Sequence, residues 1–388
     1  MEYKRLSDCA FWGKDRTDNI NYESYISTEN MIKDKGGVTI ASSLPDSKTA
    51  SAYRPNDILL SNIRPYFRKI WYADKNGSCS NDVLVVRANE DIDSKFLYYV
   101  LSDNNFFNYD TVTSKGTKMP RGTQTAIMKY LVPDINIGKQ RKIANILSAY
   151  DKLIENNNKR IRLLEQMAEN LYKEWFVRFR FPGYEDTEFE DGMPRDWVRE
   201  KIGLHYNTCS GGTPSRTHEE YYTEGTIPWV KTGEIKDGII IDTDECITEA
   251  GIKGSSAKLL PQGAVVMAMY GVNIGMLAYL DSEMTCNQAC CVFNDKNEIN
   301  SRHYLFHYLY SIRDYLLLIG FGAAQQNLSQ DLIKKVKIVI PPAELIKEFD
   351  KQKEPLYQTI RALMMQNDKL IKQRDALLPR LMSGKLEV

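Results

Sequence analysis

The stretch "LIENNNKRIRLLEQMAENLYKEWF", residues 153–176, decides how this chain is organised. It continues an apolar seam whose members are separated alternately by four and three residues. The seam contains Ile143, Leu147, Tyr150, Ile154, Ile161, Leu164, Leu171 and Trp175, with Asn157 and Ala168 completing the spacing. A seam of this period, kept over many turns, is typical of a coiled-coil helix. The sequence therefore predicts one long helix with an asparagine, Asn157, in the middle of its packing face.

Turn-forming residues set the ends of this helix. It starts after Pro133 and Gly138 and extends to about Phe176. At ~1.5 Å per residue, roughly 39 residues span ~58 Å. A second long helix is predicted from "PPAELIKEF" to Gly384, and Pro355 predicts a kink or a restart inside it. The seam of this second helix contains Leu356, Ile360, Met364, Asn367, Ile371, Leu378 and Leu381.

Asn157 and Asn367 occupy equivalent positions in the two seams (367 − 157 = 210). A buried asparagine in a coiled coil lowers stability but fixes register, because a shifted partner leaves its amide without hydrogen bonds. The two asparagines are therefore predicted to set the register of the helix pair. The alternative is that each lies at the edge of its seam, in water.

The two halves of the chain resemble each other. "YRPNDILLSNIRPYFRKIWYA" from Tyr53 is similar to "LLPQGAVVMAMYGVNIGMLAYL" from Leu259, and Asn81 corresponds to Asn287 (287 − 81 = 206). The loop "SKGTKMPRG" stands where the second half has "FGAAQQNLS", and each loop leads through an apolar strand into a long helix. A repeat of this kind predicts two similar domains. Two unrelated α/β domains with common turn chemistry are the alternative.

The predicted fold is therefore α+β, with two similar mixed α/β domains separated by a pair of long helices. The helices are expected to pair antiparallel as a coiled coil, which gives the chain an internal pseudo-two-fold repeat. The predicted boundaries are residues 1–136 for the first domain, 137–180 for the first helix, 181–341 for the second domain and 342–388 for the second helix.

Composition narrows the classes of protein. The 51 basic and 51 acidic residues balance, which argues against a protein that coats nucleic acid unselectively. The sequence contains no run of about 18 apolar residues, so no membrane span is predicted. The seven cysteines are irregularly spaced, as expected for reduced thiols in the cytoplasm. His303 and His307 share a helix face but are predicted to be surface residues, so no metal site is expected.

The sequence contains no recognisable catalytic constellation. "SGGTPS" from Ser210 lacks the lysine of a phosphate-binding loop. An Asp/Asn-Pro-Pro-Tyr/Phe tetrad, which amino-methyltransferases use to hold the target amine, is also absent from the sequence. The chain is accordingly predicted not to be an enzyme.

Two equivalent loop regions carry residue types that suit nucleic-acid recognition. In the first half these are the cations Arg64, Arg68, Lys69, Lys115, Lys118 and Arg121. In the second half they are the amides Asn273, Gln325, Gln326 and Asn327. Cations bind phosphates and guanine edges, whereas amides suit adenine edges. The loops are therefore predicted to read two different DNA sequences, and ordinary polar surface loops are the alternative.

The central junction "EQMAENLYKEWFVRFRFPGYEDTEFEDGMPRDWVREKIG" resembles that of the specificity subunits of type I restriction-modification systems. "SGGTPSR" and "YYTEGTIPWVKTGEI", which contain Arg216 and Lys231, resemble the start of a target-recognition domain in that family. "KQRKIANIL" and "LLPRLMSGKL" resemble its two helical regions, so the resemblance covers nearly the whole chain. The first domain departs from the pattern, because only "YISTENM" from Tyr25 echoes "WVKTGEI".

The resemblance implies a DNA sequence-specificity subunit that reads a bipartite site, one half per domain. Arg216 and Lys231 join the predicted DNA-binding residues on this ground. Methyltransferase and restriction-translocase subunits would be the partners, and S-adenosylmethionine, ATP and Mg²⁺ would bind to those chains rather than to this one. The alternatives are a specificity subunit of a type IIB-like assembly and a coiled-coil scaffold whose two domains bind protein or RNA.

Overall fold

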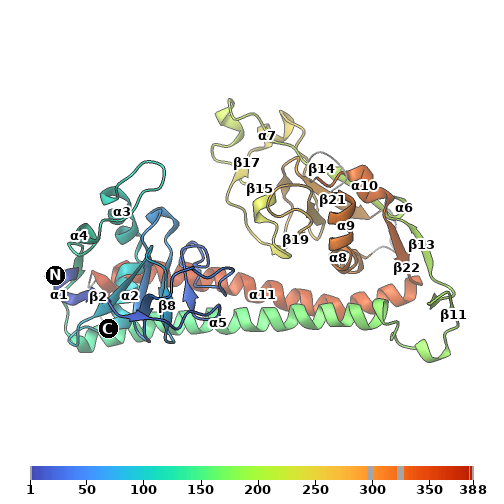
Figure 1. The fold of residues 1–388 in the computed structure, drawn as a ribbon. Helices are drawn as coiled ribbons and strands as arrows, with labels where there is room; N and C mark the ends of the chain where they lie inside the picture. The colour runs from blue at the N-terminus through green and yellow to red at the C-terminus, as the bar shows by residue number, and fades with distance from the viewer. Residues whose placement is uncertain (1, 296–300, 321–326, 384, 387–388) are drawn as a thin grey trace. The chain divides into compact units, whose positions relative to one another are not determined.

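A computed structural model describes residues 2–295, 301–320, 327–383 and 385–386, and it divides into two compact units (Figure 1). Unit 1 comprises Met1–Glu155 and Asn367–Val388, and unit 2 comprises Asn156–Gln366. Both boundaries fall inside long helices, α5 (Ile137–Tyr172) and α11 (Ala343–Met382). Each unit therefore contains its own section of both helices. No described helix combines the length and apolar character needed to cross a bilayer.

Unit 1 contains two four-stranded sheets, ordered β2-β9-β6-β7 and β3-β5-β8-β4, and a separate pair β1-β10. The strands are β1 Tyr3–Arg5, β2 Ala10–Trp12, β3 Arg16–Thr17, β4 Tyr25–Ile26, β5 Ala50–Tyr53, β6 Ile58–Ser61, β7 Ile70–Tyr72, β8 Gly77–Cys79, β9 Val83–Ala88 and β10 Leu131–Pro133. The short helices are α1 Leu6–Cys9, η1 Pro65–Phe67, α2 Ser94–Ser102, α3 Asn104–Thr113 and α4 Gln124–Ile127.

The core of unit 1 forms because its central strands carry apolar residues on both faces. Ile58–Leu60 of β6 and Val83–Val86 of β9 are all apolar and buried. Asp93 caps α2 by accepting a hydrogen bond from the backbone N–H of Phe96 at 2.8 Å. The capped helix places Phe96 and Leu97 in the same core as Ile143 of α5. The start of the long helix is thus part of the unit's core.

Unit 2 contains a five-stranded sheet, β14-β21-β18-β19-β16, a three-stranded sheet, β17-β15-β20, and the pairs β13-β22 and β11-β12. Its strands are β11 Phe189–Glu190, β12 Met193–Pro194, β13 Val198–Lys201, β14 Tyr206–Ser210, β15 Ile227–Val230, β16 Gly238–Ile240, β17 Cys246–Ile247, β18 Val265–Ala268, β19 Leu277–Leu280, β20 Thr285–Cys286, β21 Cys290–Asp295 and β22 Lys337–Ile340. Its shorter helices are η2 Lys173–Val177, η3 Tyr184–Asp186, α6 Ile202–His205, η4 Glu219–Tyr221, η5 Thr232–Glu234, α7 Glu249–Lys253, α8 Arg302–Ser311, α9 Arg313–Gly320 and α10 Gln330–Lys335.

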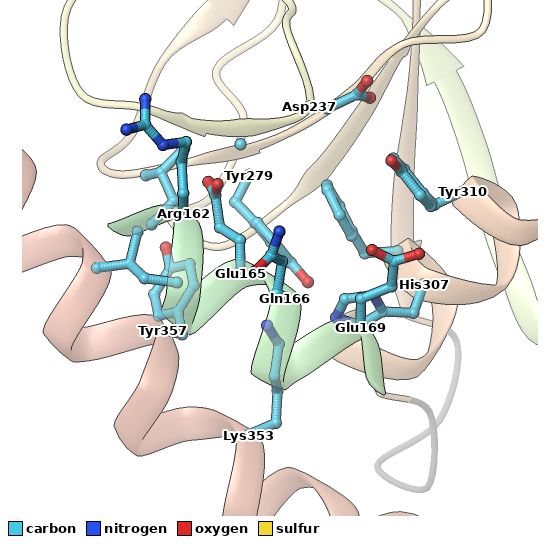
Figure 2. Close-up of a pocket in the computed structure, with 14 residues that line it drawn as sticks. Arg162, Glu165, Gln166, Glu169, Asp237, Tyr279, His307, Tyr310, Lys353 and Tyr357 are labelled. Atoms are coloured by element: carbon cyan, nitrogen blue, oxygen red, sulfur yellow. The ribbon is translucent and has the colours of Figure 1, made fainter. Parts of the chain in front are cut away.

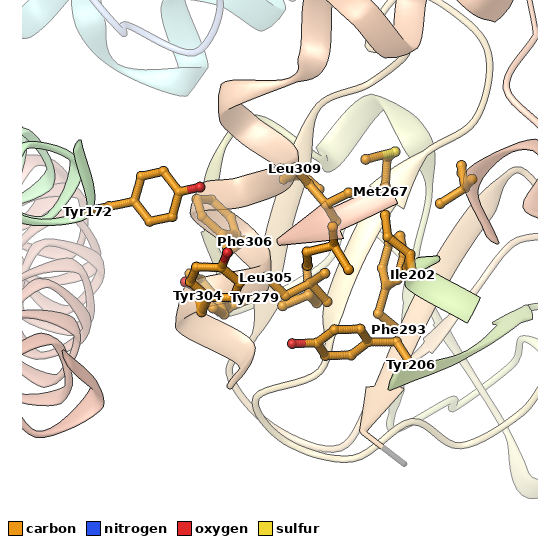
Figure 3. Close-up of a cluster of buried hydrophobic side chains, with 14 of the residues drawn as sticks. Tyr172, Ile202, Tyr206, Met267, Tyr279, Phe293, Tyr304, Leu305, Phe306 and Leu309 are labelled. Carbon is orange, nitrogen blue, oxygen red and sulfur yellow. The ribbon is translucent and has the colours of Figure 1, made fainter. Parts of the chain in front are cut away.

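An aromatic cluster joins the end of α5 to the rest of unit 2 (Figure 3). Tyr172 extends from the helix, and its ring centroid lies 5.8 Å from that of Tyr304 on α8. The helix then widens into the π-helical turn η2, which buries Trp175 and Phe176. Phe176 contacts Tyr304 edge-to-face at 4.8 Å and Phe349 of α11 at 5.0 Å. The aromatic end of the quoted stretch therefore anchors the helix pair to its domain.

Strand pairing shows that the two units are copies of one fold. Ile26 pairs with Cys79 between the parallel strands β4 and β8, and Val230 pairs with Cys286 between β15 and β20 in the same way. Antiparallel β6 and β9 in unit 1 correspond to β18 and β21 in unit 2. In both units a strand that is followed by a single helical turn, β1 in unit 1 and β13 in unit 2, pairs with the last strand before a long helix, β10 and β22. The predicted α+β class and internal repeat are confirmed.

The two long helices run antiparallel within each unit. In unit 1, Arg374 of α11 donates a hydrogen bond to Asp151 of α5 at 2.7 Å. In unit 2, the amide of Asn157 donates to Gln366 at 2.9 Å, and Trp175 packs against Phe349. Because residue numbers rise along one helix as they fall along the other, the predicted antiparallel pairing is confirmed.

The seam prediction for the second helix needs correction. Asn367 is buried as predicted, but Ile371 is 40% exposed, and Tyr357 and Leu363 are buried in place of a strict heptad set. The predicted restart at Pro355 is also wrong, because α11 is continuous from Ala343 to Met382. The buried residues of α11 are therefore set by the part of each unit that they pack against, and they do not keep one repeated spacing.

The burial of the two seam asparagines excludes one of the two hypotheses about them. Asn157 is 4% exposed and Asn367 is 8% exposed. The alternative that they lie in water at the seam edge is therefore wrong. Their role in setting register stays a prediction.

Candidate nucleic-acid interface

Four loops of unit 1 meet at one edge of its sheets. They are loop A (26–35), loop B (62–69), loop C (80–82) and loop D (114–122). Backbone hydrogen bonds join them: Ser80 N–H donates to Ile26 O at 2.9 Å, Asn62 N–H to Asp82 O at 2.8 Å and Gly122 N–H to Asn62 O at 3.0 Å. Loops far apart in sequence thus form one continuous surface, which is how rigid scaffolds present recognition loops.

Unit 2 makes the same three hydrogen bonds at the corresponding positions. Asn287 N–H donates to Val230 O at 2.9 Å, Met269 N–H to Ala289 O at 2.8 Å and Leu328 N–H to Met269 O at 2.8 Å. Its four loops are A (230–237), B (269–275), C (287–289) and D (321–328), of which only residues 327–328 of loop D are described. The three hydrogen bonds that join the described parts of the loops are therefore the same in both units.

Loop A is closed in both units by a side chain that accepts from the backbone. Ser27 N–H donates to the amide oxygen of Asn30 at 2.6 Å, and Lys231 N–H donates to the carboxylate of Glu234 at 2.7 Å. "YISTENM" and "WVKTGEI" therefore occupy the same place in the fold. The weak echo between these two segments was a true sign of the repeat.

The predicted cations of unit 1 all lie on loops B and D, but they are not equally available. Lys115, Lys118 and Arg121 are exposed on loop D, where Arg121 pairs with Asp82 of loop C at 3.1 Å. Their side chains lie at the outer surface of the four loops. Loop D is therefore the strongest candidate of unit 1 for contact with phosphates.

Loop B holds its cations more tightly. The Arg68 guanidinium donates to Asp34 at 2.9 Å, and Lys69 donates to the backbone carbonyl of Thr28 at 2.5 Å. Burial lowers the pKa of Lys69. Arg64 lies 5.8 Å from the ring centroid of Phe67, and its buried Nε has no hydrogen-bond partner among the described residues. Lys69 thus joins loop B to loop A, which differs from its predicted role as a DNA contact.

A buried carboxyl group lies beneath loops B and D. Asp110 of α3 is completely buried, and neither of its oxygens has a hydrogen-bond partner among the described residues. Desolvation by burial raises the pKa of this carboxyl to about 7. A Cβ atom at Gly122 would lie 2.5 Å from the Asp110 carboxyl oxygen, so only glycine fits this close approach.

Asn273 of unit 2 is engaged within the protein. Its amide nitrogen donates to the carbonyls of Thr232 at 3.1 Å, Gly233 at 3.2 Å and Ile235 at 2.9 Å. Asn273 therefore fastens loop B to loop A, and its contact with an adenine edge, which would require one of these N–H groups, stays a prediction.

The other predicted residues of unit 2 have different outcomes. Gln325 and Gln326 lie outside the described residues, and Asn327 is exposed. Arg216 and Lys231 both bind Glu245, at 2.6 and 3.1 Å. The hydrogen bond from Arg216 is the main cause of the lowered pKa of Glu245. This shared carboxylate holds the two cations together and offsets part of their charge.

The sequence patterns did not single out two exposed apolar side chains on loop B. Tyr66 is 48% exposed in unit 1, and Val272 is 101% exposed in unit 2. Strand pairing places loop B of the two units at an offset of 207, so Val272 corresponds to Pro65 and Tyr66 corresponds to Asn273. No signal in the sequence marked the two exposed side chains, because single apolar residues in polar loops carry no pattern.

The two histidines on α8 are buried, which overturns the prediction that they lie on the surface. His303 Nε2 lies 2.8 Å from the Glu354 carboxylate, and burial lowers the pKa of His303 to about 4. The ring of His307 stacks on Tyr172 with centroids 5.6 Å apart. No cluster of three metal-ligating side chains occurs within the described ranges.

A cavity of about 260 Å³ in unit 2 lies between α5, α11 and the sheet (Figure 2). Lys353 points from α11 toward α5, which contributes Glu165. Burial lowers the pKa of Lys353 to about 8 and raises that of Glu165. The cavity is thus a partly charged gap in the packing between the helix pair and the sheet, and Asp237 at the end of loop A forms part of its lining.

Comparisons with known proteins agree with this geometry. Residues 9–166 and 194–369 each match the type I restriction modification DNA specificity domain. The MjaIX specificity subunit of the type I restriction enzyme from Methanocaldococcus jannaschii is 28% identical, over 76% of this chain and 69% of the relative. The HindI specificity subunit from Haemophilus influenzae is 23% identical, over 93% and 94%.

A crystal structure of a type I restriction-modification S subunit from M. genitalium has a similar fold. Its TM-score is 0.59 at 16% identity, with 98% of this chain and 95% of that chain covered. The two family matches correspond to the two copies of the fold described above. This chain therefore belongs to the family defined by the type I restriction modification DNA specificity domain, of which it carries two copies.

Proposed function

We propose that this chain is the DNA sequence-specificity subunit of a type I restriction-modification complex. In this role each unit reads one half of a bipartite site with its four loops. The observation that carries the proposal is the duplicated loop frame, in which the same backbone hydrogen bonds present different side chains in the two units. A common frame with exchangeable side chains is what two readers of different sequences require.

The partners follow from this role. The family supports double-stranded DNA, methyltransferase subunits and restriction-translocase subunits as partners. S-adenosylmethionine, ATP and Mg²⁺ would then bind to those subunits, and this chain would supply specificity without catalysis of its own. A cytoplasmic location belongs to the same proposal, because the DNA to be read is found there.

The two alternative functions receive less support. The relatives described above are specificity subunits of type I enzymes, which favours that class over a type IIB-like assembly. A scaffold for protein or RNA would not require two equivalent sets of loops with different reading side chains. Neither alternative accounts for the family match over both units.

Methylome sequencing of the host, with and without this gene, tests the proposal. The expected result is one bipartite methylated motif, with a fixed spacer, that disappears when the gene is deleted. A matched strain that carries K115A, K118A and R121A tests whether each unit reads its own half of the motif. Because these residues lie only on unit 1, recognition of one half of the motif is expected to weaken more than recognition of the other.

Footprinting with purified chain and its methyltransferase partners provides the second arm. Two protected half-sites separated by an unread spacer are expected. A single continuous protected sequence, or no protection with partners present, would contradict the proposal. An unchanged methylome after deletion of the gene would contradict it as well.

A further inference from the structure

We infer that Val272 reads a thymine in the half-site of unit 2 through contact with the thymine C5-methyl group. The inference rests on the proposed function and adds a specificity-determining residue to it. Val272 has the highest exposed fraction, 101%, among the exposed large hydrophobic side chains that the structure describes. It lies on loop B, between β18 and β19, where the four loops meet.

The first step is that the tip carrying Val272 is braced. Asn273, the next residue, holds loop B against loop A through its three hydrogen bonds to backbone carbonyls. On the other side, Arg313 donates to the carbonyl of Gly275 at 2.9 Å and to Asp237 at 2.9 Å. Gly271 and Gly275 adopt φ values of +89° and +78°, which glycine tolerates without strain.

A braced tip matters for recognition. Little conformational freedom is lost when a rigid loop binds, so a small apolar contact keeps its full effect. Valine adds to this, because its β-branched side chain is restricted at χ1 and holds its two methyl groups in fixed directions. Several hydrogen bonds therefore fix the backbone on either side of Val272, while its small apolar side chain stays exposed to solvent.

The second step is the difference between the two units. Loop B has the same length in both, because the strands on either side of it align at an offset of 207 (Ile58 with Val265, Tyr72 with Tyr279). The residue of unit 1 that corresponds to Val272 is therefore Pro65, which is buried in η1. The exposed valine belongs to unit 2 alone, as expected for a side chain that reads only the half-site of unit 2.

The third step is the chemistry of the groove. The base edges in the major groove present hydrogen-bond donors and acceptors and one apolar group, the C5-methyl of thymine. A valine side chain has no hydrogen-bonding group, so the thymine methyl is the only base-edge feature it can distinguish. Lys231 precedes Thr232, whose carbonyl accepts a hydrogen bond from Asn273, and it would supply positive charge for the adjacent phosphates.

Deoxyuridine provides a direct test, because it differs from thymine only by the missing methyl group. The experiment uses the full chain in complex with its methyltransferase partners and duplexes that contain the methylated motif. Each thymine of the unit 2 half-site is replaced in turn by deoxyuridine. Wild-type complex is expected to lose roughly fourfold in affinity at one position, as for one buried methyl group.

The variant V272A is expected to bind the thymine and deoxyuridine duplexes at that position with equal affinity. V272I keeps an apolar branched side chain and is expected to retain the preference. V198A is the matched control, since Val198 is an exposed valine on β13 of the same unit, and it should leave the preference unchanged.

Each remaining outcome is decisive. The inference is overturned if no position responds to deoxyuridine, or if the response persists in V272A. It is also overturned if V272A weakens binding to both duplexes equally, which would indicate a wedge between base steps or contact with a partner protein. If the wild-type complex shows no sequence-specific binding, the proposed function itself fails.

Discussion

Loops A–D of unit 1 and loops A–D of unit 2 share a backbone frame and differ in almost everything that the frame presents. The three hydrogen bonds that join the loops recur between corresponding residues. Unit 1 presents cations on loops B and D. Unit 2 presents Val272 and the exposed Asn327, and its cations Arg216 and Lys231 share the carboxylate of Glu245. The fold determines the positions of the loops, and under the proposed function their side chains determine which DNA sequence each unit recognises.

The two units also differ underneath the loops. Asp110 is buried in α3 of unit 1 without a hydrogen-bond partner among the described residues, whereas the buried residues of α9 in unit 2 are Leu316 and Gly320. A buried carboxyl costs stability unless it is protonated or paired, whereas a buried leucine contributes stability. Helix α3 therefore carries a destabilising buried group that α9 lacks.

The largest expected effect concerns the loop cations. Replacing Lys115, Lys118 and Arg121 by alanine removes up to three phosphate contacts from unit 1 alone. Affinity at physiological salt should fall about 100-fold, and the slope of log affinity against log salt should decrease by about 3. Salt-dependent binding measurements on the complex check both values.

The matched control for this triple variant is K14A, K48A and K129A, three exposed lysines of the same unit outside the four loops. Its salt slope should equal that of the wild type. If both triple variants reduce the slope equally, the cations of loop D act through general charge, and the contrast between the units disappears.

The next effect concerns the buried carboxyl of Asp110 in α3, which has no counterpart among the buried residues of α9. The folded-state pKa of Asp110, about 7, lies above its ordinary value of 3.8. Folded chains then bind more protons than unfolded chains between pH 4 and pH 7, so stability falls as pH rises through this window. D110N should remove most of this fall and stabilise unit 1 by about 1–3 kcal/mol at pH 8.

Hydrogen exchange of the α3 amides at pH 5 and pH 8 measures this locally. D46N is the control, because Asp46 is exposed in the same unit. Equal pH dependence in D110N and wild type would show that Asp110 gains a partner in solution.

Lys353 gives a smaller effect in unit 2. The helix sections of the two units bury different kinds of side chain. In unit 1, α5 buries the apolar Ile143 and Leu147, whereas in unit 2, α11 buries the charged Lys353. Its folded-state pKa of about 8 lies below the ordinary 10.5, so unfolded chains bind more protons between these values. Stability should therefore rise with pH from 8 to 10.5.

The variant K353M should abolish this rise and stabilise unit 2 by roughly 1 kcal/mol at pH 7. Urea unfolding across this pH range measures it, with K351M as the exposed control on the same helix. A destabilised K353M would mean that attraction to Glu165 outweighs the desolvation of the ammonium group.

The smallest effect concerns a feature common to both halves of the chain, the buried seam asparagines. N157L should stabilise the helix pair by roughly 0.5–1 kcal/mol and loosen its register. The spacer of the methylated motif should then become variable in length. N156L, at an exposed neighbouring position, should change neither property. Unchanged spacing and stability in N157L would remove the register role.

Prediction from sequence worked where one pattern repeats over many residues. The long helices, the antiparallel pair and the duplicated α+β fold follow from seam spacing and from the offset between the halves. It failed for the burial of the α8 histidines and did not anticipate the hydrogen bonds of Asn273, because both depend on local contacts. The α8 histidines become buried because the aromatic end of α5 packs over them, and Asn273 is engaged because loop A lies within reach of its amide.

The sequence by itself determined that the chain holds two versions of one domain and two long helices, since periodicity and repetition survive without knowledge of contacts. Only the tertiary structure decided which side chains are available to a ligand. Lys69 and Asn273 look like readers in sequence, yet their polar groups are engaged by neighbouring backbone carbonyls. Val272 carries no signal in sequence but is held in solvent by the contacts of its neighbour Asn273. Availability is a property of the assembled loops, because it depends on segments far apart along the chain.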